Sequence, residues 1–66
     1  MTVHIVFRGE RHEGKDIMAV FDCHTKAKTY LEKYALEKNY VYNVRAALWE
    51  KRNGYNYLEI QDWEVE

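Results

Sequence analysis

The sequence contains no proline and one cysteine, and it has no excess of charge of either sign. The single cysteine, Cys23, excludes an internal disulfide and is typical of a protein in a reducing, intracellular compartment. A formal net charge of −1 offers no general attraction to nucleic acid or to an anionic membrane. Because no run of about 18 apolar residues is present, no segment is expected to span a bilayer.

Targeting signals and repeats are also missing. The first ten residues, MTVHIVFRGE, lack the apolar region and cleavage site of a signal peptide, so we expect a cytoplasmic protein. No repeat, low-complexity segment or proline-rich linker divides the 66 residues, which therefore predict a single domain. A domain of this size buries only about 60% of the surface that its unfolded chain exposes. Association with itself or with a partner is one way to offset that marginal stability.

The residues that are present are those of a folded protein. Hydrophobic residues make up 47% of the chain and charged residues 32%, with the two signs interspersed, which argues against disorder. Aromatic residues reach 15%, and most of them are tyrosines and tryptophans. Since these two residue types serve both in cores and in interfaces, their high content favours a binding surface.

Hydrophobic periodicity predicts a hairpin followed by a helix. Residues 2–8 and 16–22 each alternate between apolar and polar side chains, and the polar loop between them contains two glycines. Two antiparallel strands are therefore expected. Apolar residues then recur at helical spacing after Asp22, a residue suited to cap a helix, and the helix should extend to about Lys38.

The stretch at residues 40–49, YVYNVRAALW, is ambiguous. Its β-branched and aromatic start favours a strand. The run RAALWEKRN, in contrast, consists of strong helix formers and is followed by Gly54 in a C-cap position. We favour a helix over residues 42–52, either separate or continuous with the first helix through a kink near Asn39. Residues 55–66 return to alternation and predict a last strand.

These elements predict an α+β fold with the order β-β-α-(α)-β. We expect three strands in an antiparallel or mixed sheet of order 2-1-3, with one long or two short helices on one face. The uncovered face would carry these residues: His4, Val6, Arg8, Met18, Val20, Tyr57 and Trp63. An apolar and aromatic patch on a small domain usually marks an interaction site. The alternative is that residues 40–49 form a second helix that folds over part of this face.

No pattern in the sequence predicts catalysis or metal binding. Asp22, Cys23 and His24 are metal-ligand types, but they are consecutive and no second cysteine exists, so no metal site is predicted. His12 and the acidic residues around it are interpreted as a solvated loop rather than an acid–base site. Neither a nucleophile–base arrangement nor a phosphate-binding glycine motif is present. We therefore expect a protein that is not an enzyme and needs no cofactor.

Three segments resemble a group of short uncharacterised proteins of tailed bacteriophages and bacteria. They are the first strand VHIVF, the segment IMAVFD that leads into KAKTYLEKY, and the closing YLEIQDWEVE. The resemblance covers most of the chain and implies a β-β-α-β module, with YVYNVRAALW as an apolar insertion before the last strand. Many such phage proteins bind a host protein and alter its activity, and the resemblance implies this function here. It carries over no catalytic residue.

The sequence thus leads to a hypothesis of a small, non-catalytic, phage-encoded protein. It would bind a host protein in the host cytoplasm and modulate or inhibit it, as an adaptor or by occlusion. Large aromatic side chains dominate interface energetics, and five of them are the predicted partner contacts: Tyr40, Tyr42, Trp49, Tyr57 and Trp63. One alternative is a self-associating homodimer. Another is binding of single-stranded nucleic acid through a basic and aromatic patch, which would consist of Arg45, Trp49, Lys51 and Arg52.

Overall fold

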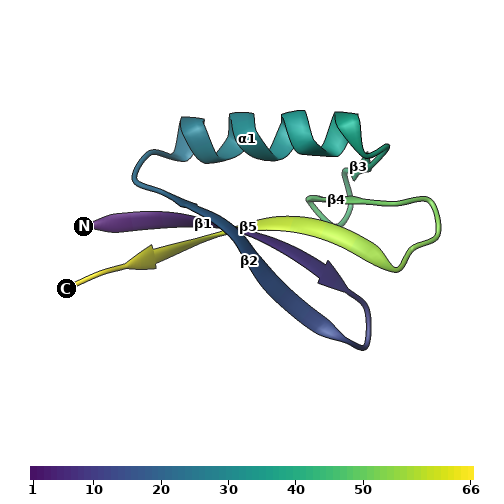
Figure 1. Ribbon diagram of the computed structural model, residues 1–66, viewed down its shortest axis with the longest axis horizontal. Coiled ribbons are helices and arrows are strands. Elements are labelled where there is room, and N and C mark those ends of the chain that lie inside the picture. The colour runs from purple at the N-terminus through teal and green to yellow at the C-terminus, as the bar shows by residue number, and fades with distance from the viewer.

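A single helix packs on one side of a five-stranded antiparallel sheet in the computed structural model, which describes residues 1–66 (Figure 1). The elements are β1 (Thr2–Glu10), β2 (Gly14–Phe21), α1 (His24–Glu37), β3 (Val41–Asn43), β4 (Leu48–Glu50) and β5 (Asn56–Glu64). The strand order across the sheet is β2-β1-β5-β4-β3. No helix of the protein combines the length and the apolar character that crossing a membrane requires.

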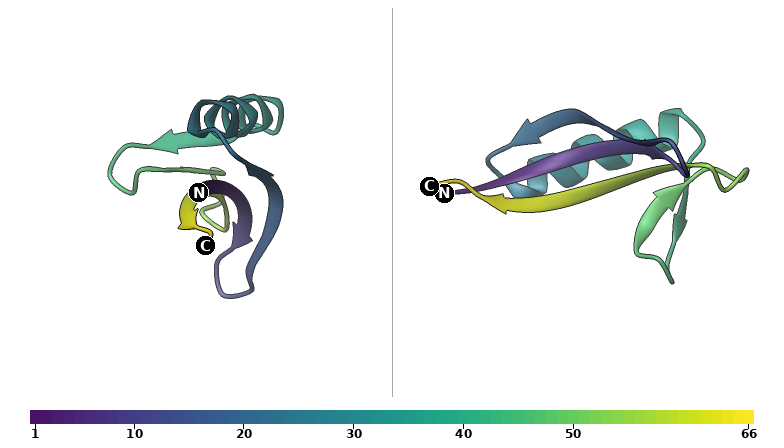
Figure 2. Two further views of the ribbon diagram at one scale, coloured as in Figure 1. Left: turned by 90° about the vertical axis from the view of Figure 1, so that its left-hand side faces the viewer. Right: turned by 90° about the horizontal axis from the view of Figure 1, so that it is seen from below.

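The predicted three-stranded sheet of order 2-1-3 is wrong, although the protein does combine a helix with a sheet. The last strand, β5, does lie beside β1, and it runs antiparallel to β1 along its whole length. Two further strands, β4 and β3, extend the sheet beyond β5. They come from the stretch for which we favoured a helix. Figure 2 shows that this β3–β4 hairpin projects away from the three long strands.

Local geometry explains why residues 42–52 form a hairpin and a loop instead of the predicted helix. The Asn43 side-chain oxygen accepts hydrogen bonds from the backbone N–H groups of Arg45 and Ala46, at 3.0 and 3.2 Å, which closes a turn. Ala47 follows with a φ of 54°, in the left-handed region that a helix excludes. Trp49 then packs against the core from β4. Tertiary packing therefore overrides the helix propensity of the RAAL segment.

The first helix ends sharply before the hairpin. Asn39 has a φ of 63°, and the next residue, Tyr40, donates its backbone N–H to the carbonyl oxygen of Ala35 at 2.8 Å. This is the bond pattern of a Schellman motif, in which an Asn can replace the usual Gly. The ring of Tyr40 also lies 6.0 Å from that of Tyr34. The chain thus turns away from the helix axis, and the predicted option of a continuous, kinked helix is excluded.

The N-cap of α1 lies one residue later than predicted. Cys23, not Asp22, is the N-cap residue, and it makes no side-chain capping hydrogen bond. The first turn of α1 also contains no acidic residue. Neither of the two features that usually stabilise a helix N-terminus is therefore present.

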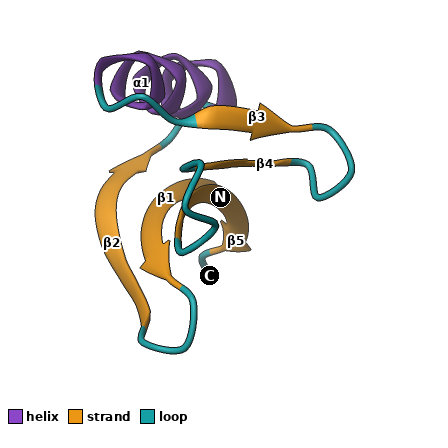
Figure 3. Ribbon diagram, turned by 90° about the vertical axis from the view of Figure 1, so that its right-hand side faces the viewer, coloured by secondary structure: helices purple, strands orange, loops and turns teal.

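The core lies between α1 and the sheet. Val6 and Leu58, both fully buried, face α1 from the two central strands. Together with residues of α1 and the adjoining turn they form one cluster: Val6, Ala27, Leu31, Ala35, Tyr40 and Leu58. Figure 3 shows α1 along one side of the twisted sheet.

The prediction of which sheet residues are uncovered is partly wrong. Val6 lies under α1, and Met18 packs against the core cluster, next to the irregularity in the pairing of β1 with β2. His4 also faces the helix side, since it pairs with Asp62 and contacts His24 of α1. Alternation defines two faces of a strand but does not say which one is covered.

A matched pair of substitutions on α1 tests the position of the core. Leu31 is 5% exposed and Leu36 is 70% exposed, on the same helix. We expect Leu31→Ala to lower the free energy of unfolding by about 2–5 kcal/mol, because it leaves a cavity under the helix. Leu36→Ala should change it by less than about 0.5 kcal/mol. Urea denaturation followed by circular dichroism measures both values, and similar costs for the two variants would contradict this packing.

Candidate functional site

An apolar groove with a volume of about 570 Å³ lies between α1 and the β4–β5 side of the sheet. Most of its lining is hydrophobic, and His24, Lys28 and Glu32 of α1 bring polar groups to it. The β3–β4 hairpin contributes to the same lining. The lining residues are His24, Lys28, Leu31, Glu32, Tyr42, Ala47, Leu48, Trp49, Leu58, Glu59 and Ile60. Seven of these eleven residues are hydrophobic, against three of eight and three of nine in two other pockets of the protein.

One edge of β5 is only half covered beside this groove. Its inner edge pairs with β1 from Asn56 to Glu64. Its outer edge pairs with β4 at two positions alone, Tyr57 and Leu58. Beyond Leu58 no strand lies against the outer edge, and the view from below in Figure 2 shows the hairpin confined to one end of β5.

The backbone groups along this free edge can be assigned from neighbouring hydrogen bonds. The carbonyl of Asn56 accepts a bond from Lys51 on the outer side, and the N–H of Val65 donates to Met1 on the β1 side. Successive residues of an antiparallel strand direct their backbone groups to opposite edges. Ile60 and Asp62 therefore direct both N–H and C=O to the free edge, where no strand meets them.

The shortness of β4 creates this free edge. The chain leaves β4 in a turn in which the Gly54 N–H donates to the Lys51 carbonyl at 2.9 Å. Gly54 has a φ of 75°, and the Asn53 side chain accepts a bond from the Tyr55 N–H at 2.9 Å. These two turn residues bring the chain back into β5 immediately. This turn sets the register of β4 against β5, and because β4 begins only at Leu48, after the positive φ of Ala47, the hairpin covers only the beginning of β5.

Two of the five aromatic residues predicted to contact a partner meet at the groove. Tyr42 and Trp49, opposite each other on β3 and β4, lie edge to face with ring centroids 5.4 Å apart. Both line the groove. Tyr40, in contrast, is 6% exposed and belongs to the core, so it offers little surface to a partner.

The other two predicted contact residues lie on the side of the sheet away from α1. Trp63 is 54% exposed, and its indole N–H donates to the Gln61 side chain at 3.0 Å. The Tyr57 ring covers Gly9, where an added Cβ would overlap the ring. A Lys15–Glu59 ion pair of 2.7 Å lies on the same side. The five aromatic residues therefore do not form one continuous surface.

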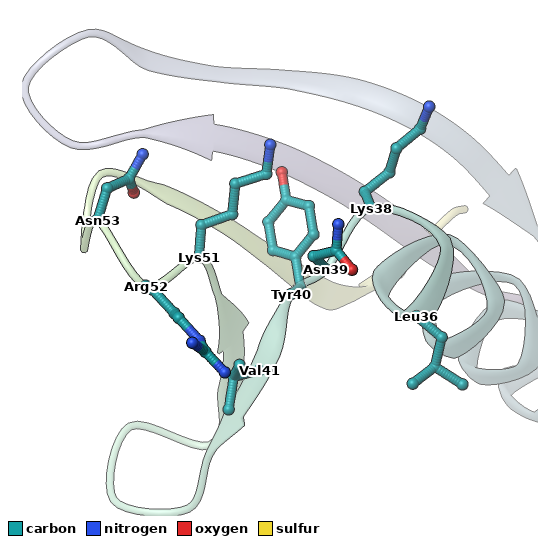
Figure 4. Close-up of a pocket in the computed structure, with 8 residues that line it drawn as sticks. All are labelled: Leu36, Lys38, Asn39, Tyr40, Val41, Lys51, Arg52 and Asn53. Atoms are coloured by element: carbon teal, nitrogen blue, oxygen red, sulfur yellow. The ribbon is translucent and has the colours of Figure 1, made fainter.

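The three basic residues of the predicted nucleic-acid patch, Arg45, Lys51 and Arg52, line one pocket of about 490 Å³ at the hairpin, and Trp49 is not part of its lining. Lys51 and Arg52 line a pocket of about 720 Å³ together with Lys38 (Figure 4). In this pocket the Lys51 side chain extends alongside Tyr40, whereas Lys38 extends away from the Tyr40 ring and Arg52 extends toward Val41. The Lys51 amino group also lies 5.3 Å from the centre of the Tyr40 ring. The predicted basic residues therefore do come together in one pocket, but Glu50 lies among them and Trp49 lines the apolar groove instead.

The groove was not foreseen in the sequence. In the sequence, its lining residues Leu31, Leu58 and Ile60 stand out only as periodic apolar positions of the predicted helix and last strand. The free edge depends on the length of β4, which is set by the two turns that flank it. The turn signals that could have indicated a hairpin are Asn43, Asn53 and Gly54.

No protein-family model, curated protein or solved structure matches this chain. The resemblance to short phage and bacterial proteins therefore stays a prediction from the sequence. The functional argument rests on the geometry of the groove and of the free edge.

The burial of Tyr40 has a measurable consequence at high pH. Burial raises the pKa of the Tyr40 hydroxyl above its ordinary value of 10.0, and Tyr34 adds to this effect while Arg8 opposes it. Because the folded state favours the neutral phenol, this contribution to stability is complete below pH 10 and is lost as the pH rises through the folded pKa. In a titration of phenolate absorbance, we expect one late-titrating group that disappears in Tyr40→Phe. If the absorbance that is lost in Tyr40→Phe belongs instead to the early part of the titration, Tyr40 is solvent-accessible and this assignment is wrong.

Proposed function

We propose that this chain is a non-catalytic protein-interaction module that captures an extended peptide segment of a partner protein. The captured segment adds as a strand to the free outer edge of β5, next to β4. One observation carries the proposal: the outer edge of β5 beyond Leu58 has no strand beside it and runs along an apolar groove.

Backbone pairing supplies the first part of the recognition. An exposed strand edge presents unpaired N–H and C=O groups and readily accepts another strand. Such strand addition is an established mode of peptide recognition, in which main-chain hydrogen bonds give affinity. Here Ile60 and Asp62 provide these groups. The added segment continues the sheet in the space that β4 leaves open.

The groove supplies the second part, the selection of side chains. Alternate side chains of the added strand point toward α1, where Leu31, Trp49 and Ile60 form an apolar lining. The rim carries Lys28 and Glu32, whose charged atoms lie 3.9 Å apart in an exposed pair. Because an exposed pair of this kind is worth little, both groups are free to contact charges on the peptide. The expected ligand is therefore an extended segment with apolar residues at every second position.

The identity of the partner is the part of the proposal that rests on the resemblance alone. Under the proposal the partner is a host protein, and the chain modulates it by covering or tethering one of its extended segments. A second copy of this chain is the competing occupant of the same edge, since two β5 edges could pair around a two-fold axis. The two occupants differ in stoichiometry and in their dependence on protein concentration.

Backbone N-methylation tests the edge directly. Chemical synthesis allows N-methylation of Ile60, which removes an edge-facing donor and leaves every side chain and the β1 pairing intact. A library of random peptides about ten residues long, selected against the unmodified chain, provides the ligand. We expect N-methylation to weaken binding of a selected peptide by about tenfold or more, because one hydrogen bond is lost and a methyl group blocks the edge.

The matched control is N-methylation of Val20. Its N–H faces the other free edge of the sheet, because Val20 lies opposite Ile5, whose backbone groups point to β5, whereas Ala19 and Phe21 lie opposite residues whose groups point to β2. This change should leave peptide affinity unaltered. Equal weakening by the two modifications, or selected peptides without alternating apolar residues, would contradict strand addition at β5. A concentration-dependent dimer in sedimentation that N-methyl-Ile60 abolishes would assign the edge to a second copy instead.

A further inference from the structure

Three metal-ligand side chains from three separate elements meet at the end of the sheet where α1 begins. His4 comes from β1, His24 is the first residue of α1, and Asp62 comes from β5. One ligand atom from each lies within 4.8 Å of the other two. The Asp62 Oδ1 atom is 2.6 Å from His4 Nδ1 and 4.0 Å from His24 Nδ1. The protein's remaining histidine, His12, lies in the β1–β2 turn and takes no part.

The fold itself brings these three residues together. His4 and Asp62 are directly opposite in the β1–β5 register, so their side chains share the helix side of the sheet. The start of α1 places the His24 ring against the His4 ring, edge to face, with centroids 5.2 Å apart. The His4 side chain is 13% exposed, whereas those of His24 and Asp62 are more than half exposed. The cluster is therefore anchored on one side and open to solvent on the other.

We propose that His4, His24 and Asp62 bind a divalent transition-metal ion, with Zn²⁺ as the reference ion. Two imidazoles and one carboxylate are a ligand set that zinc uses, at about 2.0–2.2 Å from each donor atom. A tetrahedral site with these bond lengths places donor atoms about 3.4 Å apart, and the observed 2.6 and 4.0 Å separations lie on either side of this value. Hard ions such as Mg²⁺ and Ca²⁺ prefer oxygen ligands and do not suit this set.

A bound ion would supply a cross-link that this small domain lacks, since its single cysteine, Cys23, is free. The ion would join β1, α1 and β5 at one point, and the binding free energy would contribute to folding. The positive end of the α1 dipole opposes a cation at this position, and the Asp62 carboxylate would offset part of that cost. The remaining coordination positions face solvent, beside the groove that His24 also lines.

Titration of the chelator-treated full chain with ZnCl₂ tests this site. We expect one Zn²⁺ per chain by calorimetry, a rise in melting temperature on Zn²⁺ addition, and, with Co²⁺, visible absorption typical of a low coordination number. His24→Ala changes an exposed side chain and should keep the fold, yet it should weaken Zn²⁺ binding by more than about tenfold. Asp62→Asn should also weaken binding.

Two variants serve as controls. His12→Asn removes the third histidine with a residue that tolerates its φ of 72°, and Cys23→Ser removes the thiol next to His24. Both should bind Zn²⁺ as the unmodified chain does. The proposal is overturned if the folded chain binds no Zn²⁺ at millimolar concentration. It is equally overturned if His12→Asn weakens binding as much as His24→Ala, or if Cys23→Ser abolishes it. None of these readouts involves a peptide, so the outcome is separate from that of the proposed function.

Discussion

Leu58 occupies the position on which the rest of the structure depends. It is fully buried beneath α1 and is also the last residue of β5 that pairs with β4. Small residues of the helix, Ala27 and Ala35, are fully buried as well, so that α1 can approach the sheet closely. The core is therefore centred where the long strands meet the short hairpin. The groove lies directly beside this centre, since Leu31 and Leu58 of the core also line it.

The two proposed sites follow from the same arrangement. The short hairpin covers the outer edge of β5 at one end and contributes Tyr42 and Trp49 to the groove, while the outer edge at the other end of β5 stays free. At that unpaired end Asp62 meets His4 and the first residue of α1. An ion at this point would hold α1 against the sheet and so preserve the shape of the groove. The metal site and the peptide edge are thus adjacent parts of one surface, although each can be tested alone.

The sequence did not predict the hairpin formed by residues 41–50. Local propensities within YVYNVRAALW point to both strand and helix, and the balance is decided by contacts outside the stretch. The Asn43 turn and the left-handed φ of Ala47 exclude a helix. Packing of Trp49 against the core then stabilises the strand. The faces of β1 could not be assigned for a related reason, since both carry apolar residues and only the position of α1 decides which is covered.

The sequence by itself determined the elements whose signal is local: the first hairpin, the extent of α1 to within two residues, and a strand at the end of the chain. Periodicity specifies these elements because each uses neighbouring residues. The amino-acid sequence also excluded an internal disulfide, because the chain has a single cysteine. Only the tertiary structure decided the free edge of β5, the groove and the His4–His24–Asp62 cluster. His4 and Asp62 are 58 positions apart, and no spacing along the chain reports a contact that the strand register creates.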